Sequence, residues 1–191
     1  MSIELIKALQ DPTLYNHPTE GFRVLETHIS WVILTGPFAY KIKKPVDFGF
    51  LDFSSLDKRH YYCNEELRLN RRLAPELYLD LVPIFGSTTR PLLSTENTLP
   101  TVDPAHNLTD HHPIEYAVKM VQFDQSGSLD KLEEEQKLTP KHIETLAKSL
   151  ASFHQSVNTQ IPNDNFGTAE GVFAPVDENF DQVKAKLSQP S

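Results

Sequence analysis

Cysteine and long apolar runs are almost missing from this sequence, and each absence excludes a class of protein. Its 191 residues include one cysteine, Cys63, so no disulfide can form within the chain. No stretch approaches the roughly 18 consecutive apolar residues of a membrane-spanning helix. The N-terminus also lacks the basic segment and following apolar segment of a secretory signal. We therefore expect a cytoplasmic protein with no membrane partner.

Positive charge and glycine are also scarce. The chain has 18 Lys and Arg against 26 Asp and Glu, a net charge of −8, which disfavours nucleic acid as a partner. The balance is uneven, because residues 1–75 carry 10 basic and 9 acidic side chains whereas residues 76–191 carry 8 and 17. The seven glycines are scattered, so neither G-x-G-x-x-G nor G-x-x-x-x-G-K-[ST], the phosphate-binding motifs, occurs.

Apolar residues make up 39% of the chain, enough for a core, and their spacing predicts where the strands lie. Strands are expected where Val, Ile, Phe, Tyr and Trp concentrate, at 22–27, 31–35, 38–43, 81–85 and 115–123. The first three have connections too short for anything but antiparallel neighbours. Pro83 predicts that the fourth is an edge or short strand, and a further short strand at 91–93 stays open.

Helical periodicity appears mainly in the later part of the chain. It predicts helices at 2–10, 54–73, 129–137, from Thr139 onward and at 177–187. The order is therefore sheet first and helices second, with a break at 125–128, which is typical of an α+β fold. We expect about five antiparallel strands in a first domain, 1–122, and helices in a second, 123–191.

The third strand places charged residues on one of its faces. Alternation puts Ala39, Lys41 and Lys43 on one side and the intervening aromatic and aliphatic residues on the other. A small residue two positions before a lysine leaves room for a flat ligand beside the charge. The alternative is a solvated face that happens to carry two lysines.

The helix at 54–73 carries a glutamate on its predicted apolar side. The positions one or two turns from Glu66 are all apolar: Tyr62, Leu69 and Leu73. The same offsets from Glu65 are mostly polar. A buried carboxylate needs a partner, and Lys41 is a candidate. The alternative is a glutamate at the rim, satisfied by Arg59 or Arg68 and by solvent.

Several segments together resemble a known family. They are 26–32 (ETHISWV), 39–47 (AYKIKKPVD), 49–54 (GFLDFS), 66–75 (ELRLNRRLAP), 115–120 (EYAVKM) and 150–154 (LASFH). The resemblance, over roughly residues 12–170, is to the aminoglycoside phosphotransferase and protein-kinase-like family. It is closer to uncharacterised bacterial kinase-like proteins in which such a domain is often joined to a P-loop ATPase domain. It implies a kinase-like N-lobe with a C-type helix, followed by the first helices of a C-lobe.

The resemblance implies an ATP site whose phosphate half lies on the third strand. Lys41 would anchor the α- and β-phosphates, and Glu66 would hold Lys41 by an ion pair. Lys43 is the fallback for Lys41. The turn that would cover the phosphates contains Thr27, His28 and Ser30.

The adenine half of the implied site lies on the third and fifth strands. Ala39 would leave room for the flat base, and Met120 would lie at the back of the adenine pocket. The backbone of Val121 and of Phe123 would hydrogen-bond the base. The implied cofactor is ATP, with Mg²⁺ in the complete enzyme.

The implied activity is transfer of the γ-phosphate of ATP to a hydroxyl of an unknown small-molecule acceptor. The catalytic motif H-x-D-x-x-x-x-N does not occur within these residues, and the family places it after 150–154, so we expect it beyond Ser191. We therefore predict no catalytic residue and no metal ligand in this chain. The string Asp47-Phe48-Gly49 precedes the glutamate helix and is predicted to be a turn rather than a metal-binding D-F-G.

The alternative function is a non-catalytic module that senses a nucleotide or binds another protein. An incomplete set of C-lobe helices would leave apolar surface exposed. We therefore include a homodimer through residues 123–191 among the expected partners.

Overall fold

The computed structural model describes residues 3–94, 112–157 and 167–187, and divides into two compact units, residues 1–137 and 138–191. The first unit contains a sheet and helices, so the α+β class is confirmed. The second contains helices. Each unit is considered by itself. Among the described helices, none has both the length and the hydropathy that crossing a bilayer requires.

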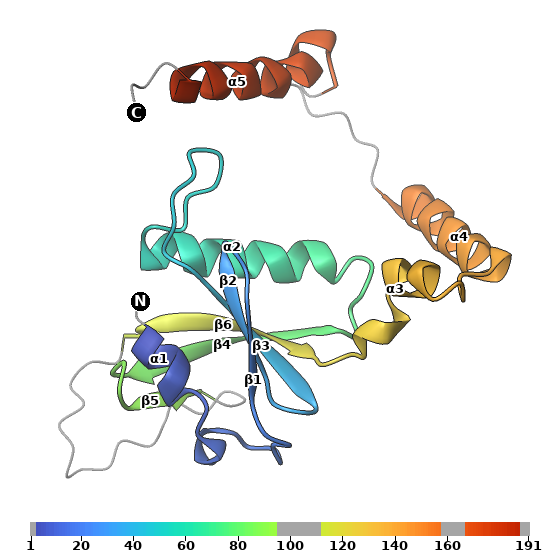
Figure 1. Cartoon of the computed structure of the whole chain (residues 1–191). Coiled ribbons are helices and arrows are strands. Elements are labelled where there is room, and N and C mark those ends of the chain that lie inside the picture. Colours follow the sequence, from blue (N-terminus) through green and yellow to red (C-terminus); the bar gives the residue numbers. More distant parts are fainter. Residues whose placement is uncertain (1–2, 95–111, 158–166, 188–191) are drawn as a thin grey trace. The chain divides into compact units, whose positions relative to one another are not determined.

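The sheet has six antiparallel strands (Figure 1), in the spatial order β1 (Arg23–Glu26), β2 (Ser30–Leu34), β3 (Phe38–Lys43), β6 (Glu115–Val121), β4 (Tyr78–Gly86) and β5 (Pro91–Leu93). The five expected strands are present, and the short strand left open at 91–93 is the sixth. β1, β2 and β3 are consecutive neighbours joined by tight turns, as their short connections predicted.

The prediction for the strand with Pro83 was wrong. β4 is nine residues long and lies between β6 and β5. The carbonyl of Pro83 accepts a hydrogen bond from the backbone N–H of Ser94 at 3.1 Å, so its polar backbone atoms face the β5 side. β5 ends at Leu93, so Pro83 lies beside the residue that follows this strand. The missing N–H of Pro83 therefore falls at the end of the β4–β5 pairing, where a proline is tolerated.

Two helices cover opposite faces of the sheet (Figure 1). α1 (Ile3–Ala8) brings Leu5 and Ile6 against Tyr40 and Ile42 of β3. α2 (Leu56–Asn70) lies on the face that carries the other side of β3, where Cys63 packs on Val118. The alternation of β3 therefore separates an apolar face under α1 from a charged face under α2.

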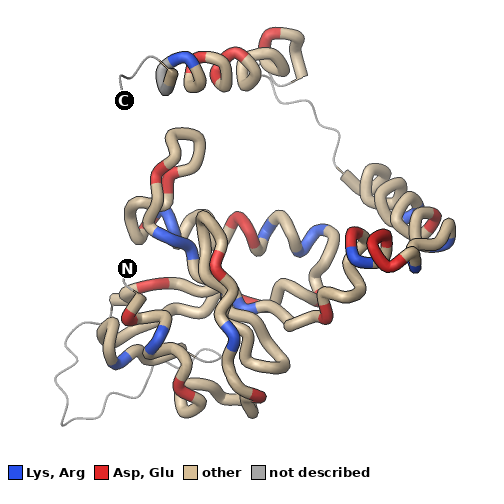
Figure 2. The backbone as a smooth tube through the Cα atoms, in the orientation of Figure 1, with Lys and Arg blue, Asp and Glu red and all other residues tan. Residues whose placement is uncertain are grey.

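α2 begins at Leu56, and Ser55 is its N-cap. The Ser55 hydroxyl accepts the backbone N–H of Lys58 at 3.2 Å. Acidic and basic residues follow one another along the helix (Figure 2), and its buried residues are Arg59, Cys63 and Leu67.

The buried stripe of α2 therefore lies on a different side of the helix from the one that the sequence predicted. Leu69 and Leu73, which defined that stripe in the sequence, are 46% and 56% exposed. Glu66 precedes Leu67 and lies at the margin of the observed stripe. Its side chain is nevertheless only 10% exposed, because the ion pairs described below draw it toward the sheet.

The segment between β3 and α2 contains the predicted turn. Asp47 and Asp52 form an isolated antiparallel bridge, and the Asp47 carboxylate accepts the backbone N–H of Gly49 at 2.8 Å. Gly49 has φ +85°, a conformation that favours glycine. The D-F-G string is thus the tip of a hairpin.

The remaining elements are short 3₁₀ turns and helices. They are η1 (Pro12–Leu14), η2 (Gln125–Gly127), α3 (Leu129–Glu134), α4 (Pro140–Ser156) and α5 (Ala169–Leu187). α4 begins after Thr139, as predicted. α5 begins earlier than predicted, because Gly171 and Pro175 lie within the helix rather than in turns. Residues 95–111, between β5 and β6, lie outside the described residues.

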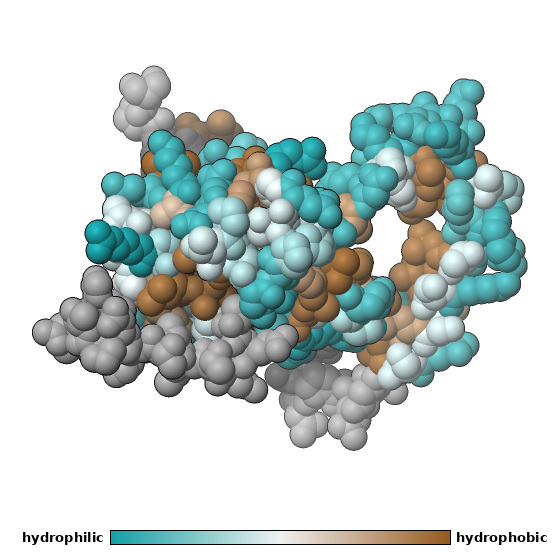
Figure 3. Space-filling view, turned by 90° about the horizontal axis from the view of Figure 1, so that it is seen from below, coloured by the Kyte–Doolittle hydropathy of each residue, from teal (hydrophilic) through white to brown (hydrophobic). Residues whose placement is uncertain are grey.

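Apolar side chains lie open on α4, on the right in Figure 3. Ile143, Leu146 and Leu150 are spaced three and four residues apart, so they form one stripe along the helix. They are 50%, 42% and 39% exposed.

Candidate nucleotide site

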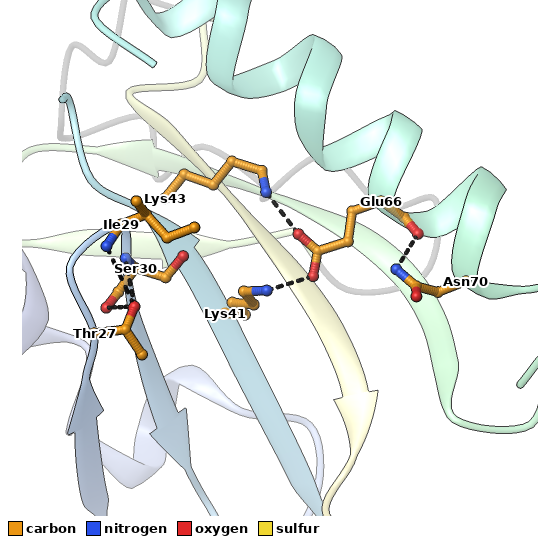
Figure 4. A network of polar contacts seen from close by, with 7 residues as sticks. All are labelled: Thr27, Ile29, Ser30, Lys41, Lys43, Glu66 and Asn70. Atoms are coloured by element: carbon orange, nitrogen blue, oxygen red, sulfur yellow. Dashed lines mark hydrogen bonds and ion pairs between the residues drawn. The ribbon is translucent and has the colours of Figure 1, made fainter. Parts of the chain in front are cut away.

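Two lysines of β3 converge on one glutamate of α2 (Figure 4). The Nζ atom of Lys41 lies 2.7 Å from Oε1 of Glu66, and that of Lys43 lies 2.6 Å from Oε2. These three residues form what we call the lysine cluster. The predicted pairing of Lys41 with Glu66 is present, and Lys43 joins it because both lysines share one face of β3. Arg68 instead pairs with Glu65.

The lysine cluster contains two cations and one anion. Burial alone would raise the pKa of the Glu66 carboxyl, but the ammonium groups of Lys41 and Lys43 hold it below its usual range. Glu66 is therefore ionised at neutral pH, and the cluster retains one positive charge. The side chain of Lys43 is 6% exposed, whereas that of Lys41 is 27% exposed. The excess charge is consequently accessible at Lys41.

Lys41 also lines a cleft of about 860 Å³ on the same side of the sheet. Six residues predicted for the nucleotide site contribute to this cleft: Thr27, Ala39, Lys41, Met120, Val121 and Phe123. Glu66 lies behind Lys41 rather than in the cleft lining. The cleft therefore extends from a lysine on β3 to the segment that follows β6.

The strand register explains how this wall is assembled. Leu25 of β1 lies opposite Val32 of β2, which in turn lies opposite Lys41 of β3. Arg23 and Leu34 are aligned with Ala39 in the same way, so all these side chains share one face. Sequence reasoning missed the residues from β1 and β2, although alternation combined with two hairpin registers would have identified them.

The far end of the cleft also includes residues that the sequence did not single out. They are Tyr78, Gln122, Asp124 and Gln125. The backbone N–H of Gln122 donates to the carbonyl of Pro37 at 3.0 Å, and its side-chain oxygen accepts the N–H of Gly36 at 3.3 Å. These bonds join the segment after β6 to the β2–β3 turn. The position of Gln122 in the lining is therefore fixed by the β2–β3 turn.

One predicted backbone donor is already occupied. The N–H of Val121 donates to the carbonyl of Leu77 at 2.9 Å. It cannot at the same time donate to a base in the cleft. Val121 therefore contributes to the lining without its N–H.

The turn between β1 and β2 differs from the turn implied by the resemblance. The Thr27 hydroxyl accepts the backbone N–H groups of Ile29 and Ser30 at 3.3 and 3.0 Å (Figure 4). These two amides are thus turned toward Thr27 rather than toward a ligand. Ser30 is fully buried, and its hydroxyl has no hydrogen-bond partner among the described residues. Neither His28 nor Ser30 lines the cleft.

Within the described residues, no group of three or more His, Cys, Asp or Glu side chains could hold a metal ion. Asp124 is the only acidic residue of the cleft lining in the described chain. Its pKa is lowered mainly by the hydrogen bonds that Ser126 donates to it. The cleft as built can attract an anion at Lys41 but contains no carboxylate pair for a cation.

Comparisons with known proteins give a short match. An uncharacterised protein of Mycobacterium tuberculosis and another of Mycobacterium bovis are each 43% identical to this chain over 74 residues, which is 37% of this chain and 15% of the relative. The matched segment thus spans only a small part of the length of these relatives. No family model matches the chain, and no solved structure matches it.

Proposed function

We propose that this chain binds ATP in the cleft and is the nucleotide-binding part of a kinase-like phosphotransferase. The observation that carries the proposal is the position of Lys41. It lines the cleft and is held from behind by Glu66, which also binds Lys43. A cation that is fixed at the wall of a cleft, with an excess of positive charge behind it, is suited to hold a polyphosphate.

The apolar residues of the cleft support a nucleotide over a simple anion. Leu25, Val32 and Met120 line the same cleft as Lys41. The small side chain of Ala39, also in the lining, leaves space beside the ammonium group of Lys41. A volume of about 860 Å³ lies within the usual range for small-molecule sites. A planar base would lie against these side chains while its phosphates extend toward Lys41.

Phosphoryl transfer to the hydroxyl of a small molecule is the activity proposed for the complete enzyme. It needs a carboxylate that orients the acceptor and oxygen ligands for Mg²⁺. Among the described residues, the cleft supplies the phosphate anchor, so the proposal assigns both other functions to residues that do not line it. The acceptor would contact those residues.

Calorimetric titration with Mg-ATP tests the proposal. We expect binding to the wild type, and saturating ligand should stabilise the fold by about 2.7 kcal/mol at a hundred times Kd. Lys41→Ala should weaken binding at least tenfold. Lys58→Ala is the matched control, since Lys58 is also ion-paired, to Asp52, but lies outside the cleft. Absence of binding by the wild type, or equal binding by Lys41→Ala, would contradict the proposal.

The apolar stripe of α4 favours a second candidate, a module that pairs with another copy of itself. Ile143, Leu146 and Leu150 would supply the contact. Sedimentation equilibrium should then show a dimer that Leu146→Glu dissociates and the exposed-site control Lys148→Glu does not. A monomer at all concentrations would remove this candidate.

A further inference from the structure

A second ion pair joins α2 to the sheet outside the cleft. The Nε of Arg59 lies 3.0 Å from both carboxylate oxygens of Glu115, and its Nη2 lies 3.0 Å from Oε2. Its Nη1 donates to the backbone carbonyls of Phe53 and Ser54 at 2.9 and 3.2 Å. We call Arg59 and Glu115 the arginine pair.

The arginine pair is buried and internally satisfied. Arg59 is 6% exposed and Glu115 is fully buried. Besides Arg59, Glu115 accepts the backbone N–H of Tyr116 at 3.1 Å. None of these atoms lines the cleft, so the pair has no direct part in the proposed binding of a nucleotide.

Its place on the helix connects it to the lysine cluster. Arg59 lies in the first half of α2, and Glu66 follows seven residues later, about 10 Å along the helix and two turns away on nearly the same face. Glu115 is the first residue of β6, while Lys41 and Lys43 belong to the adjacent β3. α2 is therefore attached to two neighbouring strands at two points.

The contacts between these two points give little directional constraint. The buried apolar residues of α2 are Cys63 and Leu67, and apolar packing permits small rotations and shifts along the helix axis. A guanidinium that binds both oxygens of a carboxylate is directional. The arginine pair is thus a directional contact that limits the rotation of the first half of α2, and with it the direction of Glu66. At the C-terminal end of the helix, Arg71 donates to the backbone carbonyls of Tyr78 and Leu79.

We propose that Arg59 and Glu115 are positioning residues: they place Glu66 between Lys41 and Lys43, and through Glu66 they place Lys41 in the cleft. The nucleotide part of this proposal rests on the proposed function. The geometric part does not, because the direction of Glu66 can be measured without a nucleotide.

The test replaces the pair by apolar side chains, in the double variant Arg59→Met with Glu115→Leu. Buried ion pairs replaced in this way often leave the fold as stable as before, whereas the directional contact is lost. The matched control is Arg68→Met with Glu65→Leu, which removes the exposed ion pair on the same helix. A purely structural role for the arginine pair predicts that a stably folded double variant behaves like the wild type.

Two measurements are made on the wild type, the double variant and the control variant. The first is the rate at which an amine-reactive ester acylates Lys41, followed by peptide mass spectrometry; we expect a rise of about tenfold in the double variant, since Glu66 no longer holds Lys41. The second is the Kd for Mg-ATP, which should rise about tenfold. The control variant should match the wild type in both.

The outcomes separate this proposal from the proposed function. If a folded double variant has the wild-type acylation rate, the positioning role is overturned. If the wild type does not bind Mg-ATP, the proposed function fails, and the acylation rates still decide the positioning role. If the double variant does not fold, Arg59→Lys replaces it, because lysine keeps the charge but cannot bind both oxygens in a fixed plane. The same rise or absence of a rise in acylation then decides.

Discussion

The lysine cluster and the arginine pair both connect α2 to the sheet, yet they differ in exposure and in charge balance. The arginine pair is closed to solvent and contains one charge of each sign. The lysine cluster borders the cleft through Lys41 and has two ammonium groups for one carboxylate, an excess of one positive charge. The first arrangement is suited to fixing a helix, and the second to fixing a helix while leaving a cation for a ligand.

The carboxylates respond to these surroundings in opposite ways. Burial raises the pKa of Glu115 despite the hydrogen bonds from Arg59. The pKa of Glu66 is lowered instead, because two ammonium groups outweigh the effect of its burial. The number of cations around each carboxylate, and not burial alone, thus decides the direction of the shift.

The largest effect on stability should come from breaking the arginine pair on one side only. Glu115→Gln leaves the guanidinium of Arg59 buried without its counter-charge, and we expect a loss of about 3 kcal/mol in the free energy of unfolding. Urea denaturation measures it. Glu65→Gln removes the exposed partner of Arg68 and should leave the midpoint unchanged. A similar midpoint for both variants would mean that burial does not distinguish the two pairs.

Breaking the lysine cluster should cost less. Glu66→Gln leaves two lysines without their counter-charge, but Lys41 is partly exposed and water can screen it. We expect a loss of about 2 kcal/mol in the same denaturation experiment. A larger loss than that of Glu115→Gln would reverse the order that the exposures predict.

The pH dependence should distinguish the cluster from the rest of the fold. The carboxyl of Glu66 has a pKa near 4.5 in an unfolded chain and a lower one in the folded protein, so the unfolded state takes up the proton first as the pH falls. The stabilisation is complete above 4.5 and is lost as the pH falls through the folded value. Thermal melting between neutral and acid pH should therefore show a smaller decrease for Glu66→Gln than for the wild type. Parallel curves would show that the cluster does not titrate.

The smallest effect concerns the thiol of Cys63, which lies on α2 between Arg59 of the arginine pair and Glu66 of the lysine cluster. Cys63 is fully buried, and burial raises its pKa to about 12, so it should react very slowly with a disulfide reagent at neutral pH. Reaction requires α2 to separate from the sheet. The rate of the reaction of Cys63 with the disulfide reagent should increase in Glu115→Gln. The absorbance of the thiolate released from the reagent measures this rate. Fast reaction in the wild type would show that α2 is loosely held.

Local patterns predicted the elements and part of the candidate site. Alternation along residues 38–43 correctly separated Lys41 and Lys43 from the apolar face, and the need to pair a buried carboxylate led to Lys41 and Glu66. The apolar stripe of α2 was less well predicted, because Leu69 has the correct spacing but faces solvent, and Leu73 lies beyond the end of the helix.

Contacts between distant segments could not be predicted in the same way. Arg59 was an alternative partner for Glu66, and it pairs with Glu115, 56 residues away. Nothing in the sequence spacing ties the first residue of β6 to the first half of α2; that contact follows from the order of strands in the sheet. The residues of β1 and β2 in the cleft depend in the same way on two hairpin registers.

The most direct measurement uses an acyl phosphate derivative of ATP, which transfers its acyl group to a lysine amine beside the phosphates. Mass spectrometry then identifies the labelled lysine. We predict that Lys41 is labelled, that an excess of ATP prevents the labelling, and that buried Lys43 remains unmodified. Labelling that ATP does not prevent, or that falls on lysines outside the cleft, would contradict the account.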